Sequence, residues 1–237
     1  GKQGKVQTGT PKFTEGDAEV PLKVDADQPA KFVVNGTAVE DTTIDAMKDG
    51  EKVGTYEINP LTGEVTFTPN KDFVGTPDAA TVQVKDENGT AATGKYTPTV
   101  TAVTPTGEDA TSTDIQGKTQ TAKPTFTEGD AEVPLDDNVP ATFEDGTTEK
   151  VIAGVGTFTV AANGTITFVP EASFTGETPT VTIKRVDMNG TVAKASYTAT
   201  VTPAPVEPEK PEEPTKPENP AQPEEPAKPV EPADSAK

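Results

Sequence analysis

The stretch FTEGDAEVPL occupies residues 13–22 and returns unchanged at residues 126–135. Ten identical residues in a row do not arise by chance, so the chain contains an internal repeat. Further matches follow at an offset of 101 residues: VTFTP at 65–69 with ITFVP at 166–170, FVG at 73–75 with FTG at 174–176, and DENGT at 86–90 with DMNGT at 187–191. Tyr96 and Tyr197 close the two copies. We therefore expect two repeats, residues 1–103 and residues 104–203.

Short strands separated by turns are predicted within each copy. Apolar residues alternate with polar ones, as at Tyr56, Ile58, Val65, Phe67, Val82 and Val84. A period of two is typical of half-buried strands, and no stretch has the period of a helix. NPLTG at 59–63 and ANG at 162–164 are predicted to close one hairpin, and NG at 88–89 and 189–190 a second.

An antiparallel sheet with one apolar face needs a second layer, and without helices that layer is another sheet. The sequence thus predicts an all-β chain of tandem antiparallel β-sandwich repeats of the immunoglobulin-like type. The expected core residues are five equivalent pairs: Phe13 and Phe126, Leu22 and Leu135, Phe67 and Phe168, Phe73 and Phe174, Tyr96 and Tyr197.

Two segments distinguish the copies. The first copy is longer, mostly within residues 38–52, and we expect this loop insertion 38–52 at the surface because surface loops tolerate extra residues. Residues 104–122 are either a flexible hinge or the docked first strand of the second copy. The sequence alone leaves both alternatives open.

Composition limits the functions open to the chain. Of 237 residues, 31% are hydrophobic and 5% aromatic, which suits two small cores. The net charge of −19 disfavours nucleic acids and anionic membranes as partners. The absence of Cys and His excludes disulfides, thiolate metal sites and His-dependent triads. No apolar run is long enough to span a membrane and residues 1–10 hold no signal segment, so we expect a piece of a longer protein.

The last part of the chain, residues 204–237, has a different character. Ten prolines recur at every third position from Pro205 to Pro232. A polyproline II helix has three residues per turn and rises ~3.1 Å per residue, so this part is expected to form an extended spacer of ~84 Å. The alternative is a disordered linker of low complexity.

A family resemblance rests on several of these phrases. GTY at 54–56 and GTF at 156–158, the VTFTP and ITFVP strands, the Phe-x-Gly pairs, D-x-N-G-T and the closing TPTVT and TATVT resemble the CshA-type fibril repeats of streptococcal cell-wall-anchored fibrillar adhesins. QGK at 3–5, repeated at 116–118, is similar to the family's opening segment. The resemblance implies an extracellular protein of a Gram-positive cell wall, whose repeats form the stalk and whose N-terminal region, outside this sequence, binds a host ligand. It also implies that the proline-rich part spans the wall ahead of an LPxTG sorting signal.

No catalytic, cofactor-binding or metal-binding residues are predicted. Paired carboxylates among Glu15, Asp17, Asp130, Asp136 and Asp137 are the one route left to acid–base chemistry, but the chain has little apolar enclosure to raise the pKa of a carboxyl group. We therefore expect no enzyme.

Two alternatives concern the D-x-N-G-T turns. Asp86 with Asn88, and Asp187 with Asn189, place oxygen atoms two residues apart, which makes Ca²⁺ an alternative to a simple Asx-type turn. A Lys–Asn isopeptide crosslink at the same asparagines is a second alternative. Against it, Lys12 of the first copy aligns with Thr125 of the second.

The function predicted from these features is mechanical. The repeats and the proline-rich spacer hold a distal adhesive region away from the cell wall, with neighbouring repeats and wall peptidoglycan as partners. The rival hypothesis is that the repeats themselves bind a host protein or mediate aggregation between cells, through residues 38–52.

Overall fold

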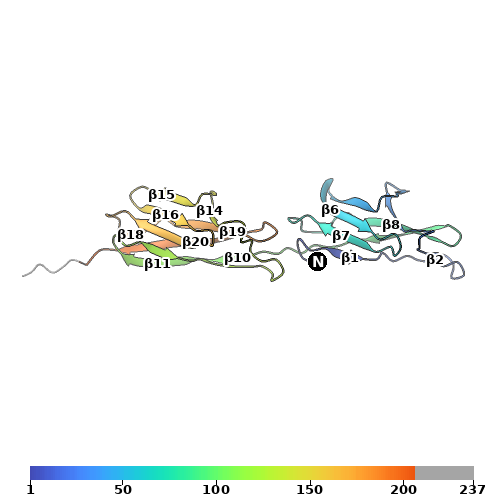
Figure 1. Ribbon diagram of the computed structural model, residues 1–237, viewed down its shortest axis with the longest axis horizontal. Coiled ribbons are helices and arrows are strands. Elements are labelled where there is room, and N and C mark those ends of the chain that lie inside the picture. The colour runs from blue at the N-terminus through green and yellow to red at the C-terminus, as the bar shows by residue number, and fades with distance from the viewer. Residues whose placement is uncertain (206–237) are drawn as a thin grey trace, which may run out of the picture. The chain divides into compact units, whose positions relative to one another are not determined.

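The computed structural model describes residues 1–205, and all regular structure among them is β (Figure 1). The predicted proline-rich spacer at 204–237 lies, apart from its first two residues, outside the described part. We refer to residues 1–103 as the first repeat and to residues 104–203 as the second repeat. No helix that could cross a membrane occurs in the part of the chain that the structure describes.

The first repeat contains two sheets (Figure 1). One has the strand order β1-β7-β6-β5, and the other has the order β2-β8-β3-β4, with β9 on the second edge of β8. The strands are β1 (Gln7–Gly9), β2 (Leu22–Lys23), β3 (Lys31–Val34), β4 (Thr37–Ala38), β5 (Thr43–Lys48), β6 (Glu51–Ile58), β7 (Val65–Pro69), β8 (Ala80–Asp86) and β9 (Ala91–Tyr96).

The second repeat has the same plan with additions. One sheet has the order β12-β17-β16-β15, the other has the order β11-β20-β19-β14 with β18 on β20, and β10 pairs with β13. The strands are β10 (Thr106–Glu108), β11 (Ala110–Ile115), β12 (Gln120–Ala122), β13 (Thr125–Thr127), β14 (Thr142–Phe143), β15 (Glu149–Ile152), β16 (Gly156–Val160), β17 (Ile166–Pro170), β18 (Gly176–Glu177), β19 (Val181–Val186) and β20 (Val192–Thr202).

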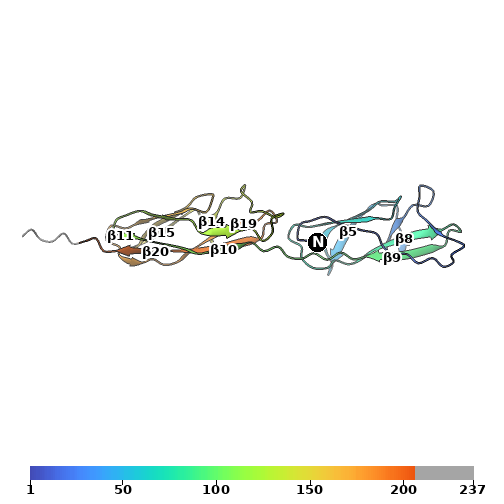
Figure 2. The same cartoon turned by 90° about the horizontal axis from the view of Figure 1, so that it is seen from below.

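Both predicted hairpins are confirmed in both repeats. Residues 59–63 join β6 to β7 and residues 162–164 join β16 to β17, all antiparallel. The NG turns join β8 to β9, which lie side by side in Figure 2, and β19 to β20. The glycines at these turns have positive φ, at 83° for Gly89 and 85° for Gly190, so the turn chemistry predicted their positions correctly.

Each repeat has its own hydrophobic core, which takes residues from both of its main sheets. Phe67, Phe168 and Tyr197 of the predicted core are fully buried. Phe13, Leu22, Phe73 and Tyr96 in the first repeat, and Phe126 and Phe174 in the second, are partly buried against these cores. Leu135 is partly buried outside the core cluster. Residues that the sequence analysis did not single out are Phe32, Phe143 and Phe158, each 0% exposed.

The expected loop at residues 38–52 is wrong: the segment is largely strand. It contains the end of β4, all of β5 and the start of β6, and β5 pairs with β6 in antiparallel register with one irregularity after Ala46. Asp49 and Gly50 have positive φ at 50° and 86°, as a tight two-residue hairpin turn requires. Ala46 is 0% exposed, and a side chain this small gave too weak an apolar signal to predict the strand.

Residues 104–122 are not a hinge. They form β10, β11 and β12, so the docked-strand alternative holds. β11 pairs with β20 in parallel, whereas every other strand pair in the described residues is antiparallel. In the second repeat, the first long strand, β11, is therefore hydrogen-bonded to the last strand, β20.

Candidate functional site

The parallel ladder between β11 and β20 is the first candidate. Its register runs without a break from Ala110 opposite Tyr197 to Ile115 opposite Thr202. Because the strands are parallel, the end at which the chain enters β11 and the end at which it leaves β20 lie at opposite ends of this ladder. A pull on the two ends of the second repeat would therefore act along the ladder.

A buried polar network holds this ladder to the other sheet. The Gln120 side chain of β12 is only 4% exposed, and its Nε2 donates to the Thr200 carbonyl oxygen over 3.0 Å. Its Oε1 accepts a hydrogen bond from the hydroxyl of Ser112, which also bonds the Tyr197 hydroxyl over 2.6 Å. Burial raises the pKa of Tyr197 above its ordinary value, so the phenol stays protonated and keeps its hydrogen bond.

Gln3 is the second candidate, because it joins the two repeats. It is 5% exposed, and its Nε2 donates to the Lys71 carbonyl over 3.0 Å and to the Thr191 hydroxyl over 3.4 Å. Its Oε1 accepts from the Val103 amide over 3.2 Å. The Asn189 side chain donates to the Gln3 carbonyl over 3.0 Å. Every polar group of Gln3 thus has a partner, and two of the partners belong to the turn between β19 and β20.

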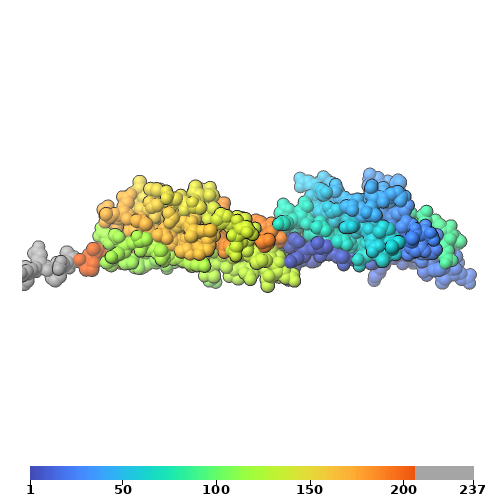
Figure 3. Space-filling model, viewed as in Figure 1, coloured from blue at the N-terminus to red at the C-terminus, as the bar shows by residue number. Residues whose placement is uncertain are grey.

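The neighbouring glycine makes this contact sterically feasible. Gly4 has a φ of 75°, and a Cβ atom at this position would collide with the Asn189 side chain. In Figure 3 the dark blue of the N-terminal residues meets the orange of the β19–β20 region. Glycine is thus required at position 4 both for its backbone conformation and for the close approach of Asn189.

An ion pair lies beside Gln3. Lys2 Nζ is 2.7 Å from Asp130 Oδ2. The hydrogen bond from Lys2 holds the pKa of Asp130 below its ordinary value, and the same bond raises the pKa of Lys2. Both side chains reach solvent, so the ion pair contributes little to stability.

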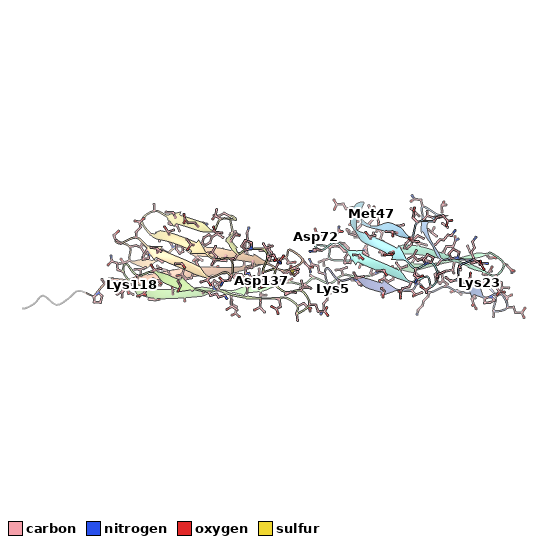
Figure 4. All side chains as sticks on the ribbon, viewed as in Figure 1. Lys5, Lys23, Met47, Asp72, Lys118 and Asp137 are labelled. Carbon is pink, nitrogen blue, oxygen red and sulfur yellow. The ribbon has the colours of Figure 1, made fainter. Side chains whose placement is uncertain are left out.

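The QGK segment of the second repeat has the same local geometry without a partner repeat. Gln116 Nε2 donates to the Ala172 carbonyl over 2.9 Å, as Gln3 does to Lys71. Gln116 is only partly buried, and a Cβ at Gly117, whose φ is 78°, would meet nothing within 4 Å. In Figure 4, Lys5 and Asp72 lie at the end of the first repeat nearest Asp137, while Lys118 lies at the far end of the second.

The D-x-N-G-T turns are Asx turns, as the simpler interpretation predicted. Asp86 Oδ1 accepts hydrogen bonds from the amides of Asn88 and Thr90, at 2.9 and 2.8 Å. Asp187 Oδ1 does the same for Asn189 and Thr191. The residues described contain no group of three or more acidic side chains arranged to hold a metal ion. Calcium binding and the isopeptide crosslink stay predictions.

The other acidic residues predicted as a remote catalytic possibility do not converge. Asp17 and Asp136 each cap their own turn. Asp137 bonds Arg185 over 2.6 Å, and Asp130 bonds Lys2. Glu15 is exposed.

The segment 38–52 contributes to a shallow groove of about 670 Å³ on the first repeat. Its walls include Val33, Val39, Ile44 and Met47, with the acidic Asp41, Asp45 and Asp78 among them. Met47 is labelled in Figure 4. The Tyr56 hydroxyl at the base is already engaged by the Asp78 carbonyl over 2.8 Å.

One known family matches both repeats. The model of the surface adhesin CshA repetitive domain matches residues 1–100 and 102–201. The chain belongs to this family. Membership identifies the two sandwiches as repeats of the surface-adhesin type.

Solved structures with similarity include repeat domain 13 of the fibrillar adhesin CshA from Streptococcus gordonii, at 51% identity over 29% of this chain and 87% of that one, with a TM-score of 0.18. Drosophila N-cadherin EC1-4 matches at 12% identity over 82% of this chain and 50% of that one, with a TM-score of 0.29. Mouse cadherin-23 EC22-24 matches at 15% over 82% and 65%, with a TM-score of 0.30. A comparison with curated proteins finds no match.

In the sequence, QGK and the NG turns are recognisable only as family phrases and turn signals. The contact between Gln3 and Asn189 and the role of Gln120 were not predicted. One sequence signal pointed to Gln120. The segment Q-G-K-x-Q-T occurs at residues 3–8 and again at 116–121, and its second Gln, Gln7 or Gln120, stands where a strand begins.

Proposed function

We propose that these CshA-type repeats are stalk segments that transmit tension between a distal adhesive region and the cell wall. The observation that carries the proposal is the parallel pairing of β11 with β20. A pull that separates the two ends of the second repeat loads all hydrogen bonds of this ladder together. An unzipping pull would instead load them one after another.

The composition of the ladder suits this role. Most of the paired residues are Thr, Val or Ile, whose β-branched side chains favour extended strands. The network of Gln120, Ser112 and Tyr197 ties the ladder to the sheet beneath, so that the strands resist sliding as a unit. Gln3 and Asn189 extend the connection into the preceding repeat.

Force spectroscopy with two attachment geometries tests the proposal. The chain contains no Cys, so a pair of introduced cysteines provides unique handles. Handles at T106C and A204C pull along the ladder, whereas handles at K118C and A204C pull both strands from the same end. We expect the second repeat to unfold at a severalfold higher force in the first geometry. Equal forces in both geometries would refute a load-bearing ladder.

The role in the parent protein is proposed from the family resemblance. We propose that the proline-rich part spans the peptidoglycan of a Gram-positive wall ahead of a sorting signal, and that host ligands bind a region outside this sequence. Small-angle scattering on the full chain and on a chain ending at Thr202 tests the spacer. An increase of tens of ångströms in maximum dimension is expected from the tail, and no increase would refute an extended rod.

A second candidate function is favoured by the groove beside residues 38–52. Its apolar wall and its acidic residues would suit a basic, partly apolar peptide of a host protein. Replacing residues 38–52 by the shorter equivalent from the second repeat tests this role. Loss of adhesion with an unchanged melting temperature would support it, and unchanged adhesion would exclude it.

A further inference from the structure

Four Asn-Gly pairs occur in the chain, and each of them lies in a hairpin turn. They are Asn35-Gly36 between β3 and β4, Asn88-Gly89 between β8 and β9, Asn163-Gly164 between β16 and β17, and Asn189-Gly190 between β19 and β20. Glycine has no side chain to shield its backbone nitrogen, so this nitrogen can approach and attack the side-chain carbonyl of the preceding asparagine. The four pairs differ in what holds the glycine nitrogen.

In three of the pairs the glycine amide is engaged. Each of these amides donates over 2.9 Å to a carbonyl oxygen of its own turn: Gly89 to Asp86, Gly164 to Ala161 and Gly190 to Asp187. A nitrogen that is bonded in this way must first give up its hydrogen bond before it can attack. Two of the asparagine side chains are held as well, since Asn163 Oδ1 accepts from the Thr165 amide and Asn189 Nδ2 donates to the Gln3 carbonyl, both over 3.0 Å.

The pair Asn35-Gly36 is free of such restraints. It forms the two-residue turn between β3 and β4, with φ at 51° and 79°. Within residues 1–205 neither the Gly36 amide nor the Asn35 side chain has a hydrogen-bond partner. Both residues are exposed, and a Cβ at Gly36 would meet nothing within 4 Å. β4 has only two residues and lies at the edge of its sheet, so opening this turn disrupts few contacts.

We propose that Asn35 is a site of spontaneous deamidation in the folded protein and the most reactive of the four asparagines. The Gly36 nitrogen loses its proton to hydroxide and attacks Cγ of Asn35. The new bond from nitrogen to Cγ closes a succinimide ring, and the bond from Cγ to Nδ2 breaks, so that Nδ2 leaves as ammonia. Water then opens the ring. Opening at Cγ gives an aspartate at position 35, and opening at the main-chain carbonyl gives an isoaspartate, whose backbone runs through Cγ. One water is consumed for each ammonia released.

Both products change the groove of the first repeat. Asn35 is one of the residues that line it, together with three aspartates: Asp41, Asp45 and Asp78. Deamidation would add a fourth negative charge there. An aspartate tolerates the positive φ of this turn, whereas an isoaspartate lengthens the backbone between Val34 and Thr37, whose pairing sets the register of β3 and β4. The consequence for ligands rests on the peptide-binding role proposed for the groove, but the deamidation itself does not.

Peptide mapping of the full chain tests the proposal, because trypsin places each Asn-Gly pair on a peptide of its own: residues 32–48, 86–95, 151–184 and 186–194. The folded protein is incubated in mildly alkaline buffer and digested. Mass spectrometry then measures the conversion of amide to carboxylate in each peptide, and electron-transfer fragmentation identifies isoaspartate. We expect Asn35 to react about fivefold or more faster than Asn88, as the absence of one net hydrogen bond of ordinary strength would give. The same incubation in urea is the control, because the four pairs should then react at similar rates.

The outcomes separate the modification from its effect on the groove. Faster reaction of Asn35 in the folded protein alone supports the site. A rate at Asn35 equal to or below that at Asn88 refutes it, and a preference that persists in urea refutes the structural cause.

Binding of a peptide of alternating Lys and Leu tests the effect of the added charge. We expect Asn35→Asp to bind this peptide about two- to fivefold more tightly than the unmodified protein, as one additional exposed ion pair would give. Equal affinity would refute the effect of the charge. Binding to neither protein would refute the peptide-binding role of the groove, while the peptide mapping decides the deamidation without any ligand.

Discussion

The two repeats share a core and differ at an edge. Tyr56, Phe67 and Phe73 in the first repeat and Phe158, Phe168 and Phe174 in the second form equivalent aromatic clusters, with ring centroids 4.5–6.5 Å apart. In the second repeat β11 pairs with β20 from Ala110 to Ile115, and in the first repeat Lys2 makes a parallel bridge to Thr101. The interior of each repeat is thus specified by its own strands.

A pair of compensating substitutions supports this division. Ala199 donates its amide to the Thr178 hydroxyl over 3.0 Å. The equivalent residues in the first repeat are Pro98 and Pro77, so the donor and the acceptor are lost together. Because proline has neither an amide hydrogen nor a hydroxyl, the joint change leaves neither the donor nor the acceptor of this bond unpaired.

The largest effect is expected from truncating an equivalent core aromatic in each repeat. Phe67→Ala and Phe168→Ala should each lower the free energy of unfolding of their own repeat by about 3–5 kcal/mol, because both side chains are 0% exposed and their truncation leaves a cavity in the core. Urea denaturation followed by NMR resolves the two repeats. Val169→Ala, at a position 50% exposed, is the control. Equal loss in both repeats from one substitution would show that the cores are not independent.

A smaller effect should separate the two equivalent glutamines. Gln120→Leu should destabilise the second repeat by about 1–3 kcal/mol, since it leaves Ser112 and the Thr200 carbonyl without their buried partner. Gln7→Leu should cost less, because Gln7 Nε2 has no partner to lose. Thermal unfolding of both variants gives the comparison. A larger shift for Gln7→Leu would contradict the assignment of the incomplete network to the first repeat.

Much of this fold could be predicted because its signals are local. The NG and NPLTG turns and the alternation around Phe67 and Phe168 fix hairpins from neighbouring residues alone. β5 was missed because Ala46 carries little apolar signal and Asp49-Gly50 was not recognised as a hairpin turn. The contacts of Gln3 with Asn189 could not be predicted, because they join residues far apart in sequence through a backbone conformation that only the folded chain reveals.

The contact between the repeats can be broken at Gly4, and the equivalent Gly117 of the second repeat serves as the control. Gly4→Ala and Gly117→Ala impose the same left-handed backbone cost, about 1–2 kcal/mol, since φ is 75° and 78°. Only Gly4→Ala adds a collision with Asn189. We expect the NMR signals of the Asn189 side-chain amide and of Thr191 to shift in Gly4→Ala alone. Shifts of the same size in Gly117→Ala would mean that strain, and not contact, links the repeats.

The smallest expected effect concerns the ion pair beside that glycine. The lowered pKa of Asp130 means that the pair is complete above its ordinary pKa of 3.8 and is lost as the pH falls through the lower value in the folded protein. The raised pKa of Lys2 means that the pair persists up to 10.5 and is lost only at still higher pH. The Asn189 side-chain signal should therefore stay constant across the neutral range and move on acidification below 3.8, and Asp130→Asn should remove most of this movement. Asn at 130 can still accept the Glu132 amide bond that closes the turn, so the variant isolates the charge. Movement that persists in Asp130→Asn would show that other carboxylates govern the contact between the repeats.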